Sequence, residues 1–172
     1  QLQRYVILRT EASDSLLASS DQSALAQSLF SSGTSLHHGL DYSWGAPRLQ
    51  RALLEFIELE DIRGEARVHV ALGADQSGTL AERRGHLERA RGLYAQLGHV
   101  RGETRALIGL ADLDISTMEG AAAMQHIVEA RAIIQPLGAA RIEADLMYRT
   151  GLAILAGADE GTYSAPDLDR AI

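Results

Sequence analysis

The 172-residue sequence has no cysteine and no lysine, and it has few prolines and few aromatic residues. The absence of cysteine excludes a disulfide framework and a thiolate site. With three prolines and 5% aromatic residues, the chain is dominated by Ala, Leu, Glu and Arg. These residues are good helix formers. The composition therefore predicts a helical chain, and a hydrophobic content of 46% is that of a globular protein.

All sixteen basic residues are arginine, and the net charge is −7. A nucleic-acid surface needs a concentrated positive field, so we expect no direct nucleic-acid contact. No apolar run approaches the length of a membrane span and no signal peptide is visible, so we expect a cytoplasmic chain without membrane contact. The sequence opens on Gln1 and closes just after Ala171, which indicates a fragment of a longer protein.

Small residues return every 38 to 41 residues along the chain. One column holds alanine throughout: Ala12, Ala52, Ala90, Ala130 and Ala171. A second column lies on the other helix of each unit: Gly33, Gly73, Ala111 and Gly151. Self-similarity at such a period predicts stacked helix pairs. We expect one repeat domain over 1–172, with units at about 5–33, 46–74, 80–114 and 117–156 and the start of another helix at 166–172.

The helix limits have their own signals. We call the helix with the glycine column helix A and the helix with the alanine column helix B. Thr79 and Glu82 form the pattern of a capping box, which predicts the start of a helix B that Gly98 ends. Residues 116–119, Ser-Thr-Met-Glu, predict a comparable start for the next helix B. Segments 59–67 and 97–105 repeat one pattern, so we expect the same B-to-A turn in both.

These columns resemble a tetratricopeptide-repeat array over about residues 10 to 160. The family's small residue on helix A and its alanine on helix B are present, and its aromatic on helix B matches Phe56 and Tyr94. The period exceeds the usual 34 residues. The resemblance implies an all-α, right-handed α-α superhelix of about four helix pairs. The long, Arg-rich form is similar to arrays in large bacterial regulators of the maltose-activator type, which carry an ATPase module and a DNA-binding module around the repeats.

The same resemblance implies a groove lined by helix A. Its positions in this chain are Gln27, Phe30, Arg67, Arg105, Asp145 and Tyr148. Two arginines one repeat apart, Arg67 and Arg105, would clamp a carboxylate or phosphate while an apolar strip holds the rest of a ligand. The alternative is that the arginines only keep the groove hydrated and that the apolar strip belongs to the core between repeats.

The histidines and acidic residues give no pattern of a catalytic or metal site. His37, His38 and Asp41 cluster in the longest connection without a second pair at ligand spacing, so a polar loop is expected. His69 falls in a column of apolar residues and is expected to be buried and hydrogen-bonded. His126 and Glu129 are expected to form a surface pair. We expect no enzyme, no cofactor and no metal.

The sequence therefore favours non-enzymatic recognition within a bacterial regulatory or signalling protein. The expected partner is a peptide, a protein or a small-molecule inducer in the concave groove. A ligand would act by shifting the array between two curvatures. The alternative is a structural module that assembles a homo-oligomer through exposed repeat ends.

Overall fold

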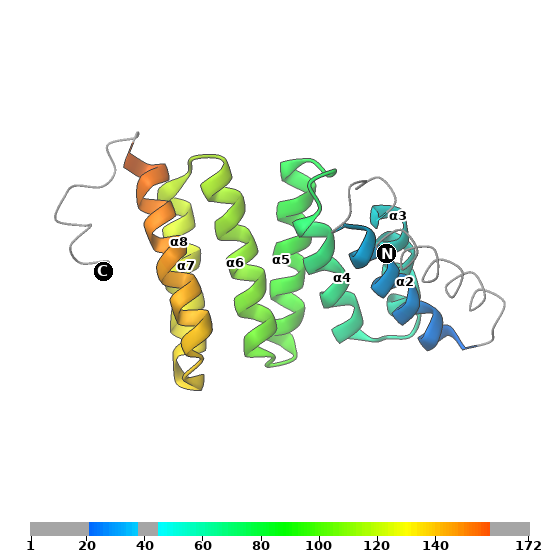
Figure 1. The fold of residues 1–172 in the computed structure, drawn as a ribbon. Coiled ribbons are helices and arrows are strands. Elements are labelled where there is room, and N and C mark those ends of the chain that lie inside the picture. The colour runs from blue at the N-terminus through cyan, green and yellow to red at the C-terminus, as the bar shows by residue number, and fades with distance from the viewer. Residues whose placement is uncertain (1–20, 38–44, 159–172) are drawn as a thin grey trace, which may run out of the picture. The chain divides into compact units, whose positions relative to one another are not determined.

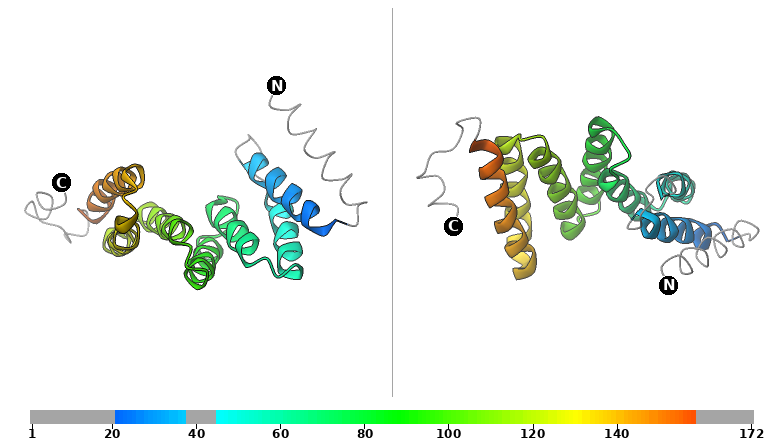
Figure 2. Two further views of the ribbon diagram at one scale, coloured as in Figure 1. Left: turned by 90° about the horizontal axis from the view of Figure 1, so that it is seen from below. Right: turned by 45° about the horizontal axis from the view of Figure 1, so that its top comes forward.

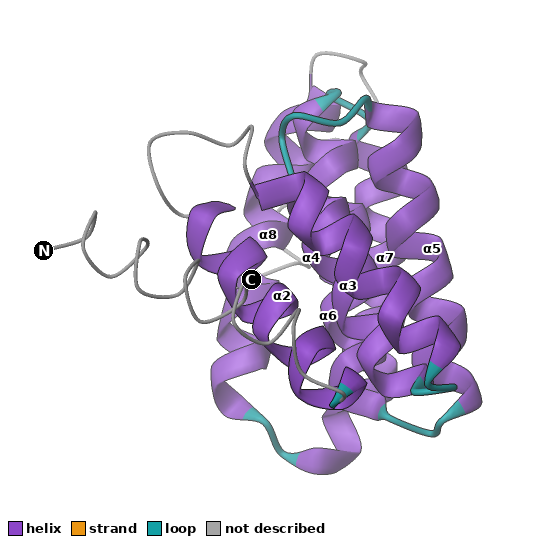
Figure 3. Ribbon diagram, turned by 90° about the vertical axis from the view of Figure 1, so that its right-hand side faces the viewer, coloured by secondary structure: helices purple, strands orange, loops and turns teal. Residues whose placement is uncertain are grey.

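The structure, a computed structural model, describes residues 21–37 and 45–158. These residues form seven α-helices and one short 3-10 helix, and no strand occurs among them (Figure 3). The elements are α2 (Gln22–His37), α3 (Gly45–Glu58), α4 (Ile62–Ala74), α5 (Leu80–Gln96), α6 (Val100–Ser116), α7 (Gly120–Ile134), η2 (Gln135–Leu137) and α8 (Ala140–Ala158). The predicted all-α class is confirmed. The predictions made for residues 1–20, for His38 and Asp41, and for 166–172 lie outside the described residues.

The chain divides into two compact units, 1–89 and 90–172, and the boundary falls inside α5. In unit 1, α3 packs between α2 and α4 (Figure 2). In unit 2, α7 packs against both α6 and α8, and α6 also contacts α8. Figure 1 shows α7 largely behind α8. Helices that follow one another along the chain are therefore neighbours within each unit, as expected for stacked helix pairs. The right-handed superhelix and the single repeat domain stay predictions.

The predicted alanine column lies in the interior of both units. Ala52, Ala90 and Ala130 have no solvent exposure. Ala52 belongs to the core of unit 1, which is formed by Leu25, Ala26, Leu29, Leu49, Ala52, Phe56, Val68 and Leu72. Ala130 belongs to the core of unit 2, which is formed by Leu107, Ala111, Ala123, Ile127, Ala130, Ile134, Leu146 and Ala153. The alanines are small enough to let neighbouring helices approach while large apolar side chains fill the space around them.

In unit 1 the glycine column marks a close approach of helix A to the helix B that follows it. A Cβ atom on Gly33 would lie 2.8 Å from Cγ of Leu49, and one on Gly73 would lie 2.4 Å from Cγ of Leu87. In the same column, Ala111 lies in the unit 2 core together with Ile127. A branched apolar side chain of helix B therefore occupies the space that a larger residue on helix A would need.

The B-to-A turn has the same construction at its first two occurrences, as predicted. The ring of Phe56 covers Gly64, where a Cβ would lie 2.3 Å from the ring, and Tyr94 covers Gly102 at 2.4 Å. Each glycine N–H donates to the residue three positions earlier, which caps helix A. In the first turn Asp61 Oδ1 accepts the N–H of Gly64 at 2.9 Å, and in the second His99 Nδ1 accepts the N–H of Gly102 at 3.0 Å.

One of the two predicted helix starts is confirmed and the other is wrong. Glu82 accepts hydrogen bonds from the backbone N–H and the hydroxyl of Thr79 at the start of α5, which is the expected capping box. At the second site, α6 continues through Ser116, whose hydroxyl donates to the carbonyl of Leu113, and α7 begins only at Gly120. Burial of Leu113 extends α6 past the sequence signal.

The packing at the glycine column predicts opposite effects of alanine at two glycines of unit 1. Gly73→Ala forces its new Cβ into Leu87 and is expected to lower the free energy of unfolding by about 1–3 kcal/mol. Gly85→Ala, on α5 with no atom within 4 Å of its Cβ position, is expected to raise it by about 0.5–1 kcal/mol through helix propensity. Urea unfolding followed by circular dichroism measures both. Equal effects at the two positions would contradict the close approach.

Candidate functional site

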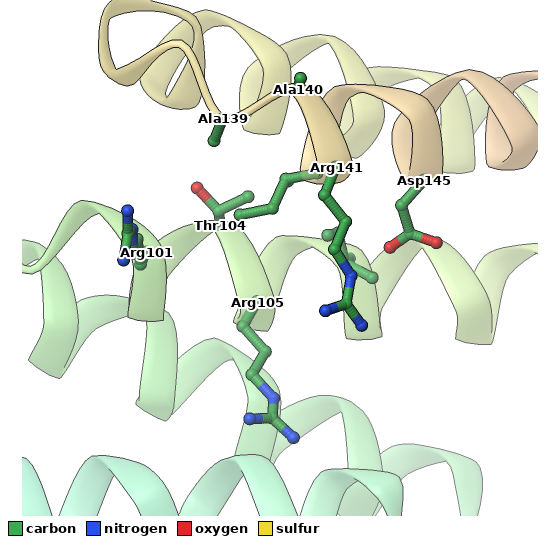
Figure 4. Close-up of a pocket in the computed structure, with 9 residues that line it drawn as sticks. Arg101, Thr104, Arg105, Ala139, Ala140, Arg141 and Asp145 are labelled. Carbon is green, nitrogen blue, oxygen red and sulfur yellow. The ribbon is translucent and has the colours of Figure 1, made fainter.

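A cavity of about 840 Å³ lies between α6 and the first turns of α8, within unit 2 (Figure 4). Three arginines, Arg101, Arg105 and Arg141, lie around it, and its apolar lining includes Ile108 and Ile142. We call this feature the α6–α8 cavity. Its volume falls in the range of small-molecule sites, which is about 300–1,000 Å³.

The cavity forms where the third B-to-A turn departs from the other two. The first two turns have a capping residue, Asp61 or His99, and then a glycine beneath an aromatic ring. The corresponding positions of the third turn are Ala139 and Ile142, and both line the cavity. Ala139 has no side-chain acceptor for the first amides of α8, and its short side chain leaves open the space that a capping residue would fill.

The arginines of the cavity are exposed and available for an added anion. Arg101 and Arg105 project from α6, and Arg141 extends from the first turn of α8 toward α6 (Figure 4). Within residues 21–37 and 45–158, no hydrogen bond or ion pair engages any of these three guanidinium groups. Other arginines of the chain are paired: Arg89, for example, contacts Glu65 at 3.0 Å. The α6–α8 cavity therefore gathers positive charge that no described carboxylate neutralises.

The acidic residue of the cavity, Asp145, is held by a neighbouring arginine. Arg149 donates to Asp145 one turn earlier on α8, and it donates to both carboxylate oxygens of Asp112 on α6 at 2.7 and 3.0 Å. Burial alone would lower the pKa of Arg149, but the hydrogen bonds and charges of Asp112 and Asp145 outweigh it and raise the pKa. This bridge ties α6 to α8 and offsets the negative charge of Asp145.

The apolar wall is continuous with the interior of unit 2. Ile108 and Ile142 are partly buried and pack against the unit 2 core. Thr104 lines the cavity but is almost completely buried, and its hydroxyl donates to the carbonyl of Val100 at 2.9 Å. Guanidinium groups beside a fixed apolar surface suit a ligand that carries an anionic group on an apolar body.

Two of the six site residues predicted from the sequence, Arg105 and Asp145, lie together in the α6–α8 cavity. Tyr148 is 67% exposed on α8 and is not part of the cavity lining. The predicted clamp pairs Arg105 with Arg67, which belongs to the other unit. That clamp therefore stays a prediction.

The other three predicted residues form a cluster in unit 1. Arg67 Nη1 donates to Gln27 Oε1 at 3.2 Å, and its guanidinium carbon lies 4.3 Å from the centre of the Phe30 ring. The side chain of Arg67 thus already has an amide and an aromatic face as neighbours. A cation over an aromatic ring contributes about 0.5–1 kcal/mol at an exposed site.

Sequence reasoning missed Arg101 and Arg141, although a signal for them was present. Both belong to a column that contains Arg63 and returns as Arg101 and Arg141 in the next two B-to-A turns. The groove positions expected from the repeat lie along the helix faces, whereas these two side chains belong to the first turns of α6 and α8. Their convergence depends on the contact between α6 and α8, which no single repeat shows.

A second group of polar side chains lies inside unit 1, where α4 meets α5. His69 is buried, and its Nδ1 lies 2.8 Å from Nδ1 of His86. Glu65 Oε1 lies 3.8 Å from the other ring nitrogen of His69 and is itself paired with Arg89. The expectation of a buried, hydrogen-bonded His69 is confirmed. One imidazole must donate to the other, so at least one of the two Nδ1 atoms is unprotonated.

The surroundings of this pair favour neutral imidazoles. Burial, followed by the charge of His86, lowers the pKa of His69 from 6.5 to about 4, and Glu65 opposes this only in part. Burial also lowers the pKa of His86, against the effect of Glu82. In unit 2, His126 Nε2 lies 3.5 Å from the buried Asp114 Oδ2, whereas Glu129 pairs with Arg91. The predicted surface pair of His126 with Glu129 is therefore wrong.

Among the described residues, no group of three or more His, Cys, Asp or Glu side chains is arranged to hold a metal ion. No helix in this part of the chain has the length and apolarity that crossing a bilayer requires. No protein-family model matches the sequence, and no curated protein matches it. The geometry of the described residues is therefore the basis for assigning a function.

The histidine pair predicts how stability depends on pH. Because the pKa of His69 is about 4 in the folded chain and 6.5 is its ordinary value, the unfolded chain binds more protons between these limits. The free energy of unfolding should therefore fall as pH drops from about 7 to about 4. Urea midpoints at several pH values measure this for the wild type and for the variant His69→Gln/His86→Gln. The variant should lose less stability over the same range, and parallel curves would contradict the assignment.

Proposed function

We propose that this chain is a non-enzymatic recognition module of the tetratricopeptide kind, which binds an anionic ligand in the α6–α8 cavity. The repeated contacts support the architecture: Gly33 with Leu49, and Gly73 with Leu87, occur one repeat apart with the same residue types. A module of this kind within a larger bacterial regulatory protein agrees with the sequence resemblance. The right-handed superhelix, the tetratricopeptide family and the regulatory context are all part of this proposal.

The single observation that carries the proposal is the set of three exposed guanidinium groups around an apolar wall. Exposed arginines that share one cavity repel one another unless an anion lies between them. Arg105 and Arg101 belong to α6 and Arg141 to α8, so an anion held by all three contacts both helices. The planar guanidinium group is suited to bidentate pairing with carboxylate or phosphate.

The arginines and the apolar wall of the α6–α8 cavity together define the class of ligand. A carboxylate or phosphate satisfies the arginines, and an apolar portion of the ligand covers Ile108 and Ile142. A small inducer or the end of a peptide has the required combination, and a volume of about 840 Å³ accommodates either. A purely inorganic anion would leave the apolar wall exposed to water and would bind less tightly.

Ligand binding would act through the pairing of α6 with α8. The bridge from Arg149 to Asp112 already joins these helices, and an anion held by Arg105 and Arg141 adds a second link across the same contact. A ligand that prefers one relative placement of α6 and α8 shifts the population toward it, by no more than its difference in affinity for the two states.

Calorimetric titration with three matched probes tests the ligand class. Octyl phosphate carries both an anion and an apolar chain, inorganic phosphate carries only the anion, and 1-octanol carries only the chain. The proposal expects octyl phosphate, below its micelle-forming concentration, to bind more tightly than either partial probe. Equal binding of octyl phosphate and octanol would contradict a role for the arginines.

Substitution of the arginines tests the site itself. Arg105→Gln and Arg141→Gln are each expected to weaken octyl phosphate binding by about tenfold to a hundredfold, because each removes charge-assisted hydrogen bonds. Arg63→Gln is the matched control, since Arg63 occupies the position of Arg101 in the first B-to-A turn and lies in unit 1. Unchanged affinity in the cavity variants, or equal loss in the control, would rule out this site.

A further inference from the structure

Unit 1 has a cavity of its own, of about 250 Å³, lined by side chains of α3, α4, α5 and the loop between α4 and α5. We call it the unit 1 cavity. Its ionisable lining includes Asp75, Glu82, Arg83 and His86. Asp75 shapes the loop, because its Oδ1 accepts the N–H of Ser77 at 2.9 Å. The volume lies just below the range of drug-sized ligands, about 300–1,000 Å³, so the cavity suits a small molecule.

The histidine pair beside this cavity determines which nitrogen His86 offers to a ligand. Nδ1 of His86 lies 2.8 Å from Nδ1 of His69, so Nε2 is the ring nitrogen that remains for a ligand. Burial lowers the pKa of both imidazoles, which are therefore neutral at about pH 7.5. A neutral imidazole has one N–H and one acceptor nitrogen. The contact between the two rings therefore has a direction, in which one ring donates and the other accepts.

Glu65 sets this direction. Its Oε1 lies 3.8 Å from Nε2 of His69, and although Arg89 pairs with Glu65, the carboxylate still acts to raise the pKa of His69. An N–H at that nitrogen points its positive end toward the carboxylate, whereas a lone pair would face negative charge. The proton of His69 therefore lies on Nε2 and its Nδ1 accepts from His86. Because His86 donates through Nδ1, its Nε2 is an acceptor.

Glu82 adds a charged acceptor beside this imidazole. It precedes His86 by one turn of α5, and its charge opposes the effect of burial on the pKa of His86. Hydrogen bonds from Thr79 lower the pKa of Glu82 and keep the carboxylate ionised. Both bonds go to Oε2, so Oε1 can accept from a ligand. Arg83 is anchored to α4, because its Nε donates to the carbonyl of Gly73 at 3.1 Å.

We propose that the unit 1 cavity binds a small primary ammonium group, which donates to Nε2 of His86 and to Oε1 of Glu82. An ammonium group has three N–H donors and no acceptor, which matches these two acceptors. An anion would meet a lone pair and a carboxylate at the same place. The site is therefore opposite in preference to the α6–α8 cavity, and it is independent of the ligand proposed there.

Nitrogen nuclear magnetic resonance of the imidazole rings tests the direction of the histidine pair. In the wild-type chain at about pH 7.5, His86 should be protonated on Nδ1 and unprotonated on Nε2. His99 is an internal reference for the opposite tautomer, because its Nδ1 accepts the N–H of Gly102 and its proton must lie on Nε2. The same tautomer in His86 and His99 would overturn the proposal.

Titration with propylammonium, followed by the ring signals of His86, tests the ligand class. At constant ionic strength, tetramethylammonium carries the charge without an N–H donor, 1-propanol carries a donor without the charge, and acetate carries the opposite charge. Propylammonium should bind several-fold more tightly than each of the other three. Equal binding of the two cations would reduce the effect to the negative charge of the chain and would overturn the proposal. Tighter binding of acetate would assign the cavity to Arg83 and would overturn it as well.

Substitutions on α5 locate the site. Glu82→Gln keeps the capping box, since glutamine serves at that position, and should weaken propylammonium binding about threefold to tenfold by removing the charge. Glu88→Gln is the matched control, because Glu88 is exposed on the same helix outside the cavity lining. His86→Leu should abolish the preference for propylammonium over tetramethylammonium. Unchanged affinity in Glu82→Gln, or an equal loss in Glu88→Gln, would exclude this cavity as the site.

Discussion

The contact on which the described structure most depends is the approach of a helix B leucine to the glycine of the preceding helix A. Gly33 and Gly73 have no room for a Cβ beside Leu49 and Leu87. This contact fixes the distance between the helices, and the buried alanine column on helix B follows from the same constraint. The repetition of the contact, one repeat apart, holds α2 against α3 and α4 against α5 in unit 1.

The candidate site arises where the repeat is broken. In the turns from α3 to α4 and from α5 to α6, a capping residue is followed by a glycine that lies under an aromatic ring. The third turn replaces them with Ala139 and Ile142, and the α6–α8 cavity opens beside both. The arginine column continues through this turn as Arg141. A chain with a net charge of −7 therefore places unneutralised positive charge at one location, where Arg149 also offsets the nearby Asp145.

The sequence was sufficient for features that depend on one or two repeats. The alanine column, the capping box at Thr79 and the B-to-A turn were predicted because local residue types determine them. The helix start predicted at residues 116–119 is wrong, because burial of Leu113 and Asp114 prolongs α6 through Ser116 and α7 begins only at Gly120. A capping pattern describes only local hydrogen bonds, and tertiary packing decided the outcome.

The candidate site was less accessible to sequence reasoning. Arg105 and Asp145 were found by their register, but the convergence of Arg101 and Arg141 depends on the contact between α6 and α8. The pairing of His69 with His86 likewise joins residues 17 positions apart on two helices. A single sequence gives the column in which such residues lie, but not the direction in which their side chains meet.

The most direct test of the account is a nuclear magnetic resonance titration of the wild-type chain with octyl phosphate. The proposal predicts that the methyl signals of Ile108 and Ile142 and the Nε signals of Arg101, Arg105 and Arg141 shift together, with one dissociation constant. The Arg67 signal of unit 1 would remain in place. Shifts spread over exposed apolar side chains such as Val128, with none at the three arginines, would contradict a ligand site in the α6–α8 cavity.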